Sequence, residues 1–208
     1  MSQNRLVSIL KEIYLFSFME DEELERLTNI CSIHKYEKDA CLFMKGDTSD
    51  HLLILIEGIV SVFKHDNKGN EIIIGLFRPY SMLAEPAILK GIPFPSTAVF
   101  KSKGAVVKVK LDIFKEKFLR DPHISYEVIQ SLLDKIQLLQ HNIHLNIASS
   151  AKEKILHFYQ QNGTLDSELK NYEIASILGM TAETFSRNLK QLQSEGRIEK
   201  TALGYRSV

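Results

Sequence analysis

The stretch TAETFSRNLKQLQSEG (Thr181–Gly196) closely follows a second short segment, YEIASILG (172–179). Apolar residues recur at helical spacing in both segments, and a Gly-Met-Thr break separates them. We expect Asn171 to cap the first helix, Gly179 to end it in a left-handed conformation, and Thr181 to cap the second. Two helices joined by a short turn with glycine predict a helix-turn-helix.

The second of these helices has a polar face whose chemistry suits the major groove of DNA. An arginine can donate two hydrogen bonds to guanine, and a glutamate can accept one from cytosine. An ordinary helical hairpin with a solvated polar face is the alternative, and eight basic against seven acidic residues over 148–208 do not separate the two. The residues that we expect to contact DNA are Thr181, Glu183, Thr184, Ser186, Arg187 and Lys190.

The composition is that of an ordinary soluble protein. The 208 residues are 44% hydrophobic with a formal net charge of +0, so the strongly basic balance of many nucleic-acid-binding proteins is absent. No signal-peptide pattern and no uncharged apolar run long enough to span a bilayer is present. The two cysteines, Cys31 and Cys41, form neither a Cys-x-x-Cys pair nor a disulfide framework. We expect a reduced, cytoplasmic protein without a metal site or membrane contact.

Three types of pattern follow one another along the chain. Residues 4–30 have helical spacing, and short β-rich runs punctuated by Gly, Asp, Asn and Pro extend from Tyr36 to about Leu111. DNKGN (66–70), between two such runs, predicts a hairpin turn. Short strands joined by tight turns indicate a small barrel or roll.

From Pro122 the spacing becomes helical again and predicts about seven turns of helix with a single apolar stripe. A symmetry mate is favoured over the chain's own roll as the partner of so long a stripe. ASSAKEK (148–154) predicts a break and a new helix start near Ser149. The stripe consists of Ile124, Val128, Leu132, Ile136, Leu139, Ile143 and Ile147.

The predicted fold is α+β, with an N-terminal antiparallel, cupin-like β-roll, a long dimerisation helix and a C-terminal winged helix-turn-helix. Residues 1–120 would form the roll with its N-terminal helices, 121–148 the long helix and 149–208 the DNA-binding domain. GRIEKTALGYRSV (196–208) predicts a small β-wing that contacts phosphate. Signatures of hydrolases, phosphate-binding loops and zinc proteases are absent from the sequence, so we expect no enzyme activity.

TAETFSRNLKQLQSEGRI resembles the recognition helix of the family of the cyclic-AMP receptor protein and the fumarate-nitrate reduction regulator (Crp/Fnr). The stretches 36–64 and 67–85 are similar to that family's β-roll, with Gly46, Asp47 and Gly58 at its turns, so the resemblance covers nearly the whole chain. The Glu-Thr-x-Ser-Arg form resembles most the branch of the fumarate-nitrate reduction regulator, and the chain as a whole resembles a nitrogen-oxide- or redox-responsive branch of the family.

The resemblance implies a homodimeric transcription regulator, paired through residues 122–147, that binds double-stranded DNA with TTGAT-like half-sites in an inverted repeat. Arg187 would read the guanine, Glu183 the complementary strand and Ser186 a thymine. An activator would also contact RNA polymerase. The alternative is a ligand-binding or interaction protein of the same fold that does not bind DNA.

The resemblance also places a candidate effector pocket at Glu85, Pro95, Ser96 and Thr97. Members that bind cyclic nucleotides have a Gly-Glu pair and an arginine for the phosphate, whereas this chain has Ala84 and Pro95 at the glycine and arginine positions. Pro79-Tyr80-Ser81 also replaces the usual Pro-Gly-Asp. A buried phosphate without its cation is costly, so we expect no cyclic-AMP binding.

The cofactor stays open. An iron–sulfur cluster needs four cysteines and is not expected with two. PFPSTA (93–98) resembles related nitrogen-oxide regulators, so haem sensing nitric oxide is one hypothesis; a Cys31–Cys41 redox switch and control by abundance alone are others. No histidine stands in a diagnostic motif, although His141 and His144 have i, i+3 spacing; the histidines are His34, His51, His65, His123, His141, His144 and His157.

Overall fold

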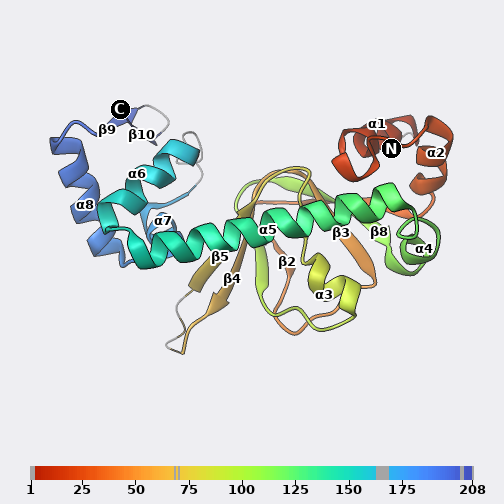
Figure 1. Cartoon of the computed structure of the whole chain (residues 1–208), viewed down its shortest axis with the longest axis horizontal. Coiled ribbons are helices and arrows are strands. Elements are labelled where there is room, and N and C mark those ends of the chain that lie inside the picture. The colour runs from red at the N-terminus through yellow and green to blue at the C-terminus, as the bar shows by residue number, and fades with distance from the viewer. Residues whose placement is uncertain (1–2, 68, 70, 163–168, 202–203, 208) are drawn as a thin grey trace. The chain divides into compact units, whose positions relative to one another are not determined.

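The computed structural model describes residues 3–67, 69, 71–162, 169–201 and 204–207. The chain divides into two compact units, which we call the N-terminal unit (Met1–Lys64 and Leu76–Lys135) and the C-terminal unit (His65–Gly75 and Ile136–Val208). Each is considered by itself (Figure 1).

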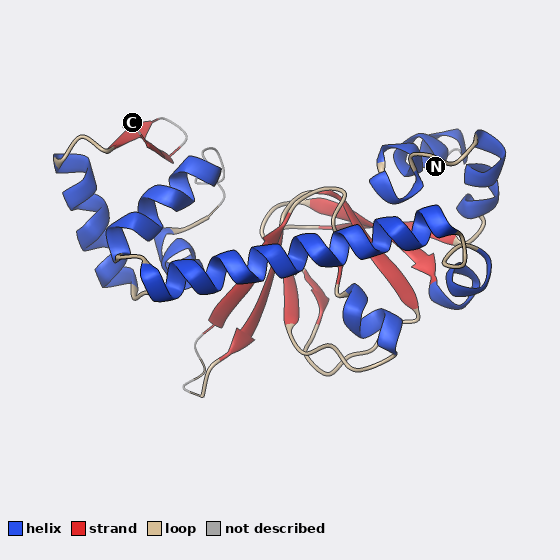
Figure 2. Ribbon diagram, in the orientation of Figure 1, coloured by secondary structure: helices blue, strands red, loops and turns tan. Residues whose placement is uncertain are grey.

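Eight strands form the predicted roll as two antiparallel sheets, with strand orders β1-β8-β3-β6 and β2-β7-β4-β5 (Figure 2). The strands are β1 (Cys31–Tyr36), β2 (Cys41–Phe43), β3 (His51–Glu57), β4 (Val60–His65), β5 (Glu71–Phe77), β6 (Met82–Leu83), β7 (Thr97–Phe100) and β8 (Gly104–Lys110).

Strand β3 is buried on both faces, which explains its nearly continuous apolar sequence. Leu53 and Leu55 belong to one core cluster with Phe43 and Phe100 of the second sheet. Leu52 and Ile54 belong to another cluster, which contains residues of the N-terminal helices and of α5. A strand with two buried faces loses the alternation of a half-exposed strand.

The helices of the N-terminal unit surround the second cluster. The helical spacing over residues 4–30 corresponds to more than one helix, because the chain turns between α1 and α2, where the Glu20 backbone N–H donates to Glu23 Oε2 at 3.1 Å. The sequence analysis also missed β1, whose mixed burial hides its strand pattern. The helical elements are α1 (Gln3–Glu12), η1 (Tyr14–Phe16), α2 (Asp21–Thr28), α3 (Glu85–Lys90), α4 (Leu111–Lys117) and α5 (Pro122–Ala148).

The long helix α5 corrects the prediction of a single apolar stripe. Ile124 and Val128 are buried in the chain's own core at 1% and 6% exposure, and Leu132 packs against the same cluster. The later stripe residues Ile136 and Leu139 are exposed, as is Ile143. The side chain of Ile147 lies outside the described part of the structure. A second, exposed row begins earlier in the helix, with Tyr126, Ile129 and Leu133.

After α5, the described residues of the C-terminal unit form three helices and a two-stranded sheet: α6 (Ala151–Asn162), α7 (Asn171–Ile177), α8 (Ala182–Ser194), β9 (Ile198–Thr201) and β10 (Gly204–Ser207). Apolar residues from every helix and from β9 are buried, including Ile155, Tyr159, Ile174, Phe185 and Ile198. This core holds α8 by its inner face.

Gly58 between β3 and β4 occupies a position that no other residue can fill without strain. Its φ is +86°, and a Cβ there would lie 2.6 Å from the Lys103 carbonyl oxygen. Gly91 also has a positive φ, +66°, but a Cβ would meet nothing within 4 Å.

We predict that Gly58→Ala lowers the free energy of unfolding by more than about 3 kcal/mol, because it adds steric overlap to a left-handed backbone. Gly91→Ala is the matched control and should lose only roughly 1–2 kcal/mol. Urea unfolding followed by circular dichroism measures both, and equal losses would contradict the steric argument.

Candidate functional site

Helix α7 and the turn after it hold the start of α8. The residue that caps α7 is Lys170 rather than Asn171: its backbone N–H donates to Glu173 Oε2 at 2.8 Å, and Asn171 is the first residue of the helix. The prediction was wrong by one residue, because a glutamate reaching back from the third position can replace a capping side chain. Gly179 follows with a φ of +64°, the left-handed conformation that we expected.

Thr181 caps α8 as predicted. Its Oγ1 accepts a hydrogen bond from the Thr184 backbone N–H at 3.2 Å, and its hydroxyl donates to Thr184 Oγ1 at 2.9 Å. Thr184 is half-buried, so its hydroxyl helps to fix the helix start. A side-chain cap contributes about 1 kcal/mol to helix stability.

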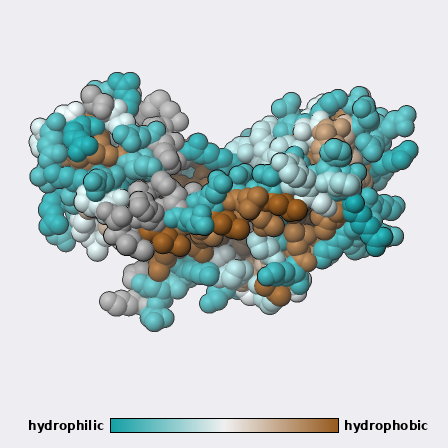
Figure 3. Space-filling model, in the orientation of Figure 1, coloured by the Kyte–Doolittle hydropathy of each residue, from teal (hydrophilic) through white to brown (hydrophobic). Residues whose placement is uncertain are grey.

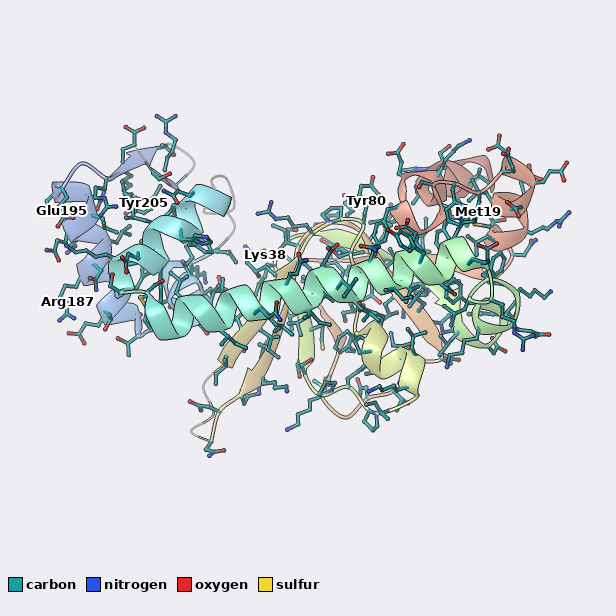
Figure 4. The ribbon with its side chains drawn as sticks, in the orientation of Figure 1. Met19, Lys38, Tyr80, Arg187, Glu195 and Tyr205 are labelled. Carbon is teal, nitrogen blue, oxygen red and sulfur yellow. The ribbon has the colours of Figure 1, made fainter. Side chains whose placement is uncertain are left out.

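The two sides of α8 have opposite character. Phe185, Leu189 and Leu192 are buried at 0%, 3% and 0% exposure. On the other side, Glu183, Arg187 and Lys190 are exposed and Ser186 is half-buried. None of the ion pairs between described residues involves these three charged side chains. Figure 4 shows Arg187 extending away from the ribbon of α8. These four polar residues have helical spacing, so they share one face of α8, the face that the core of the unit does not cover.

Contacts at both ends of α6 orient α8 and the wing. Lys152 Nζ, at the start of α6, lies 2.6 Å from Oε1 of Glu195, the C-terminal capping residue of α8. The rings of Tyr159 and Tyr205, whose centroids are 5.8 Å apart, join α6 to β10. The sequence analysis missed both contacts, because they join residues far apart in the chain.

Strands β9 and β10 pair in antiparallel fashion and confirm the predicted β-wing. Arg206 on β10 donates from Nε to Glu199 Oε1 on β9 at 2.9 Å, and its Nη2 contacts the same oxygen. Because Glu199 already neutralises it in part, Arg206 is a weaker candidate for a phosphate contact than a free arginine.

Ser150 and Glu153 form the helix start that was expected near Ser149. The Ser150 backbone N–H donates to Glu153 Oε2 at 2.7 Å, and the Glu153 backbone N–H donates to Ser150 Oγ at 3.3 Å. The hydrogen bond from the Ser150 backbone lowers the pKa of Glu153 below its ordinary value.

The second candidate region is the segment from Met82 to Thr97. Glu85 opens α3 after Ala84, which has a left-handed φ of +53°, and the Glu85 side chain is completely buried. Its Oε1 contacts Lys135 Nζ of α5, which also donates to the Met82 carbonyl at 2.7 Å. Burial lowers the pKa of Lys135, and the carboxylate of Glu85 opposes that shift. The lysine partner was not recognised from the sequence, although Lys135 continues the inward spacing of Ile124 and Val128.

The other predicted pocket residues make separate contacts. Thr97 Oγ1 accepts from the Lys45 backbone N–H at 3.0 Å, so Thr97 joins β7 to the loop after β2. Ser96 is buried and Pro95 is exposed. The Phe94 backbone N–H donates to the Asp47 carbonyl at 2.8 Å, and the rings of Phe43 and Phe94 lie 4.2 Å apart. Glu85 and Thr97 are thus each engaged by the protein itself.

The cysteines are free thiols: Cys31 is half-buried and Cys41 is exposed. Burial raises the pKa of Cys31 to about 12, which disfavours the reactive thiolate. Among the described residues, no group of three His, Cys, Asp or Glu side chains could hold a metal ion. The side chains of His141 and His144 lie outside the described part. No helix in the portion described is long and apolar enough to cross a membrane.

Comparison with known proteins assigns a family to each half of this arrangement. Residues 33–121 match the family described as Cyclic nucleotide-binding domain, and residues 143–207 match the Crp-like helix-turn-helix domain. The chain belongs to the Crp/Fnr family. Crp/Fnr proteins regulate transcription, and the predicted α+β fold with an N-terminal roll and a C-terminal helix-turn-helix is confirmed.

Curated relatives have regulatory names. The chain is 25% identical to the transcriptional activator protein FnrL of Cereibacter sphaeroides, over 86% of this chain and 77% of the relative. It is 21% identical to the cAMP-activated global transcriptional regulator CRP of Salmonella typhimurium, over 86% and 90%.

Among solved structures, FixK2 from Bradyrhizobium japonicum has a TM-score of 0.74 at 18% identity, covering 86% of this chain and 92% of that one. The c-di-GMP-responsive regulator CLP of Xanthomonas campestris has a TM-score of 0.75 at 17% identity, covering 90% and 99%. At these identities the likeness concerns the fold alone.

We predict that Glu153→Ala lowers the urea midpoint of unfolding at pH 7. Because the folded pKa of Glu153 is depressed, the contribution of its carboxylate is complete above the unfolded pKa and is lost as the pH falls through the folded value. The difference between variant and wild type should therefore shrink as the pH is lowered from about 7 toward 3. A difference that stayed constant over that range would contradict the assignment.

Proposed function

We propose that this Crp/Fnr protein is a homodimeric transcription regulator that binds an inverted repeat with TTGAT-like half-sites. The observation that carries the proposal is the outer face of α8, where Glu183, Arg187 and Lys190 are exposed on a capped helix and pair with no described residue. A helix presented in this way fits the major groove, and its N-terminal residues meet the base edges first.

Each polar residue of α8 has a role in this proposal. Arg187 donates to guanine O6 and N7, Glu183 accepts from a cytosine N4 on the complementary strand, and Ser186 touches a thymine. Lys190, one turn further along, contacts phosphate. Thr181 and Thr184 fix the helix start through their mutual hydrogen bonds, so their contacts with DNA would be to the backbone.

The exposed apolar row on α5 supports the homodimer, within the predicted range 122–147. Its members recur at steps of three and four, which is the spacing of a two-helix seam. Side chains of this size at 44–58% exposure are costly to leave in water, and a second copy of the helix would cover them. Figure 3 shows apolar side chains gathered along α5. The row consists of Tyr126, Ile129, Leu133, Ile136, Leu139 and Ile143.

We further propose that residues 1–120 act as the sensor, 121–148 as the dimerisation helix and 149–208 as the DNA-binding domain, in a cytoplasmic protein. The signal is not cyclic AMP, because Pro95 stands where members that bind cyclic nucleotides have the arginine for the phosphate. The carboxylate of Glu85 is also already paired with the ammonium of Lys135. Haem sensing nitric oxide, a redox signal acting in nitrosative stress, and control by abundance are the alternatives. If the protein activates transcription, RNA polymerase is a further partner.

Arg187→Ala should weaken binding to the cognate duplex by about 1–3 kcal/mol and relax discrimination at one base pair. Arg26→Ala is the matched control, since Arg26 is an exposed arginine on α2 and its loss removes the same charge. Fluorescence anisotropy on the cognate duplex and on a duplex altered at the guanine measures both effects. Unchanged specific binding by Arg187→Ala would show that the recognition assignment is wrong.

Ile136→Lys should convert the dimer to a monomer at micromolar concentration, because it places a charge in the apolar seam. Gln137→Lys adds the same charge one residue away, at the edge of the exposed row, where a long side chain can reach water, and should stay dimeric. Sedimentation velocity distinguishes the two states. If Ile136→Lys stays dimeric, the dimer interface does not lie on this face of α5.

A further inference from the structure

The buried ion pair between Lys135 and Glu85 joins two elements with different tasks. Lys135 belongs to α5, and Glu85 is the first residue of α3 in the candidate effector region. Glu85 is 0% exposed and the Lys135 side chain 24%. Lys135 Nζ has a second acceptor, the Met82 carbonyl at 2.7 Å, and lies 5.4 Å from the centre of the Phe77 ring. The ammonium of Lys135 is therefore held at three places: by one carboxylate, one carbonyl and one ring.

Lys135 is also the last residue on the side of α5 that packs against the roll. Ile124, Val128, Ser131 and Lys135 follow one another at steps of four, three and four, so they share one side of the helix. All four are buried or half-buried. The exposed residues Tyr126, Ile129 and Leu133 belong to the same turns but lie on the other side. Because a helix rotates about its axis as one body, the contacts of its inward residues with the roll also fix the direction in which its exposed residues point.

An ion pair specifies this orientation more sharply than apolar contact does. Ile124 and Val128 could keep most of their burial through a small rotation of the helix, since apolar packing is not directional. The ammonium of Lys135 must stay within hydrogen-bonding distance of two fixed oxygens. Removing one buried partner also leaves an uncompensated charge, so alternative orientations are penalised.

The same pair closes the region to outside ligands. Oε2 of Glu85 has no hydrogen-bond partner within the described structure, so the carboxylate depends on Lys135 for its compensation. A ligand that bound Glu85 would first have to displace a lysine of the protein itself. Three clefts on the described surface are lined by other residues, and neither Glu85 nor Lys135 borders any of these three.

We propose that Lys135 is a built-in ligand of Glu85: the pair fixes α5 in the orientation that exposes its apolar row, so the protein dimerises without a small molecule. This inference rests on the proposed function, in which that dimer is the form that binds DNA. In the proposed sensor, Lys135 takes the place at Glu85 that an outside ligand would otherwise take.

The test compares a neutral pair with a matched lysine variant. Lys135→Met or Glu85→Leu alone leaves one buried charge and should lower the thermal midpoint, whereas Lys135→Met/Glu85→Leu leaves none and should fold. Lys115→Met is the control, because Lys115 Nζ also donates to a main-chain carbonyl, that of Leu89 at 2.9 Å, but this acceptor belongs to α3 and the bond does not involve α5. Circular dichroism and urea unfolding establish that each variant is folded before its assembly is measured.

Sedimentation equilibrium then gives the dimer dissociation constant of protein refolded from denaturant, a step that removes bound small molecules. Wild type and Lys115→Met should remain dimeric, and the folded double variant should dissociate at least about tenfold more readily. A double variant that dimerises as tightly as wild type, or a refolded wild type that is monomeric, would overturn the proposal. If wild type dimerises as expected but no duplex is bound with sequence preference, the DNA-binding function fails and the role of the pair stands.

Discussion

The grip of the β-roll on one side of α5 is the constraint on which the rest of the structure depends. Ile124 and Val128 bury that side in the core, and Lys135 secures it by a buried ion pair. Because the inner side is held, the outer side must carry its apolar residues in the open. One helix thus covers the core of the roll and, in the proposed dimer, forms the seam between subunits.

The recognition surface depends on a comparable division of α8. Three large apolar residues bury its inner side, and a threonine hydroxyl satisfies the backbone at its start. The polar side chains then need no partner within the chain, which is the condition for offering them to DNA. A near-neutral domain can still bind if its free charges lie together, so the overall charge balance does not decide the function.

The helix-turn-helix could be predicted from the sequence because its signals are local. Thr181 as a cap, Gly179 in a left-handed conformation and Phe185 on the inner face are each set by neighbours a few residues away. The contacts of the roll with α5 were harder to predict, since they join positions far apart in the sequence. Lys135 and Glu85 are 50 residues apart, and nothing near Glu85 in sequence indicates a lysine partner. The single stripe predicted for α5 failed for the same reason: the spacing identifies apolar residues but not which of two partners buries them.

Sequence-specific DNA binding by the ligand-free protein is the claim on which the account rests most directly. The measurement is fluorescence anisotropy of wild-type protein on a palindromic TTGAT–ATCAA duplex and on a scrambled duplex, at one stated salt concentration. We expect binding to the palindrome at least about 10³-fold tighter than to the scrambled duplex. Equal affinity for the two duplexes would contradict it.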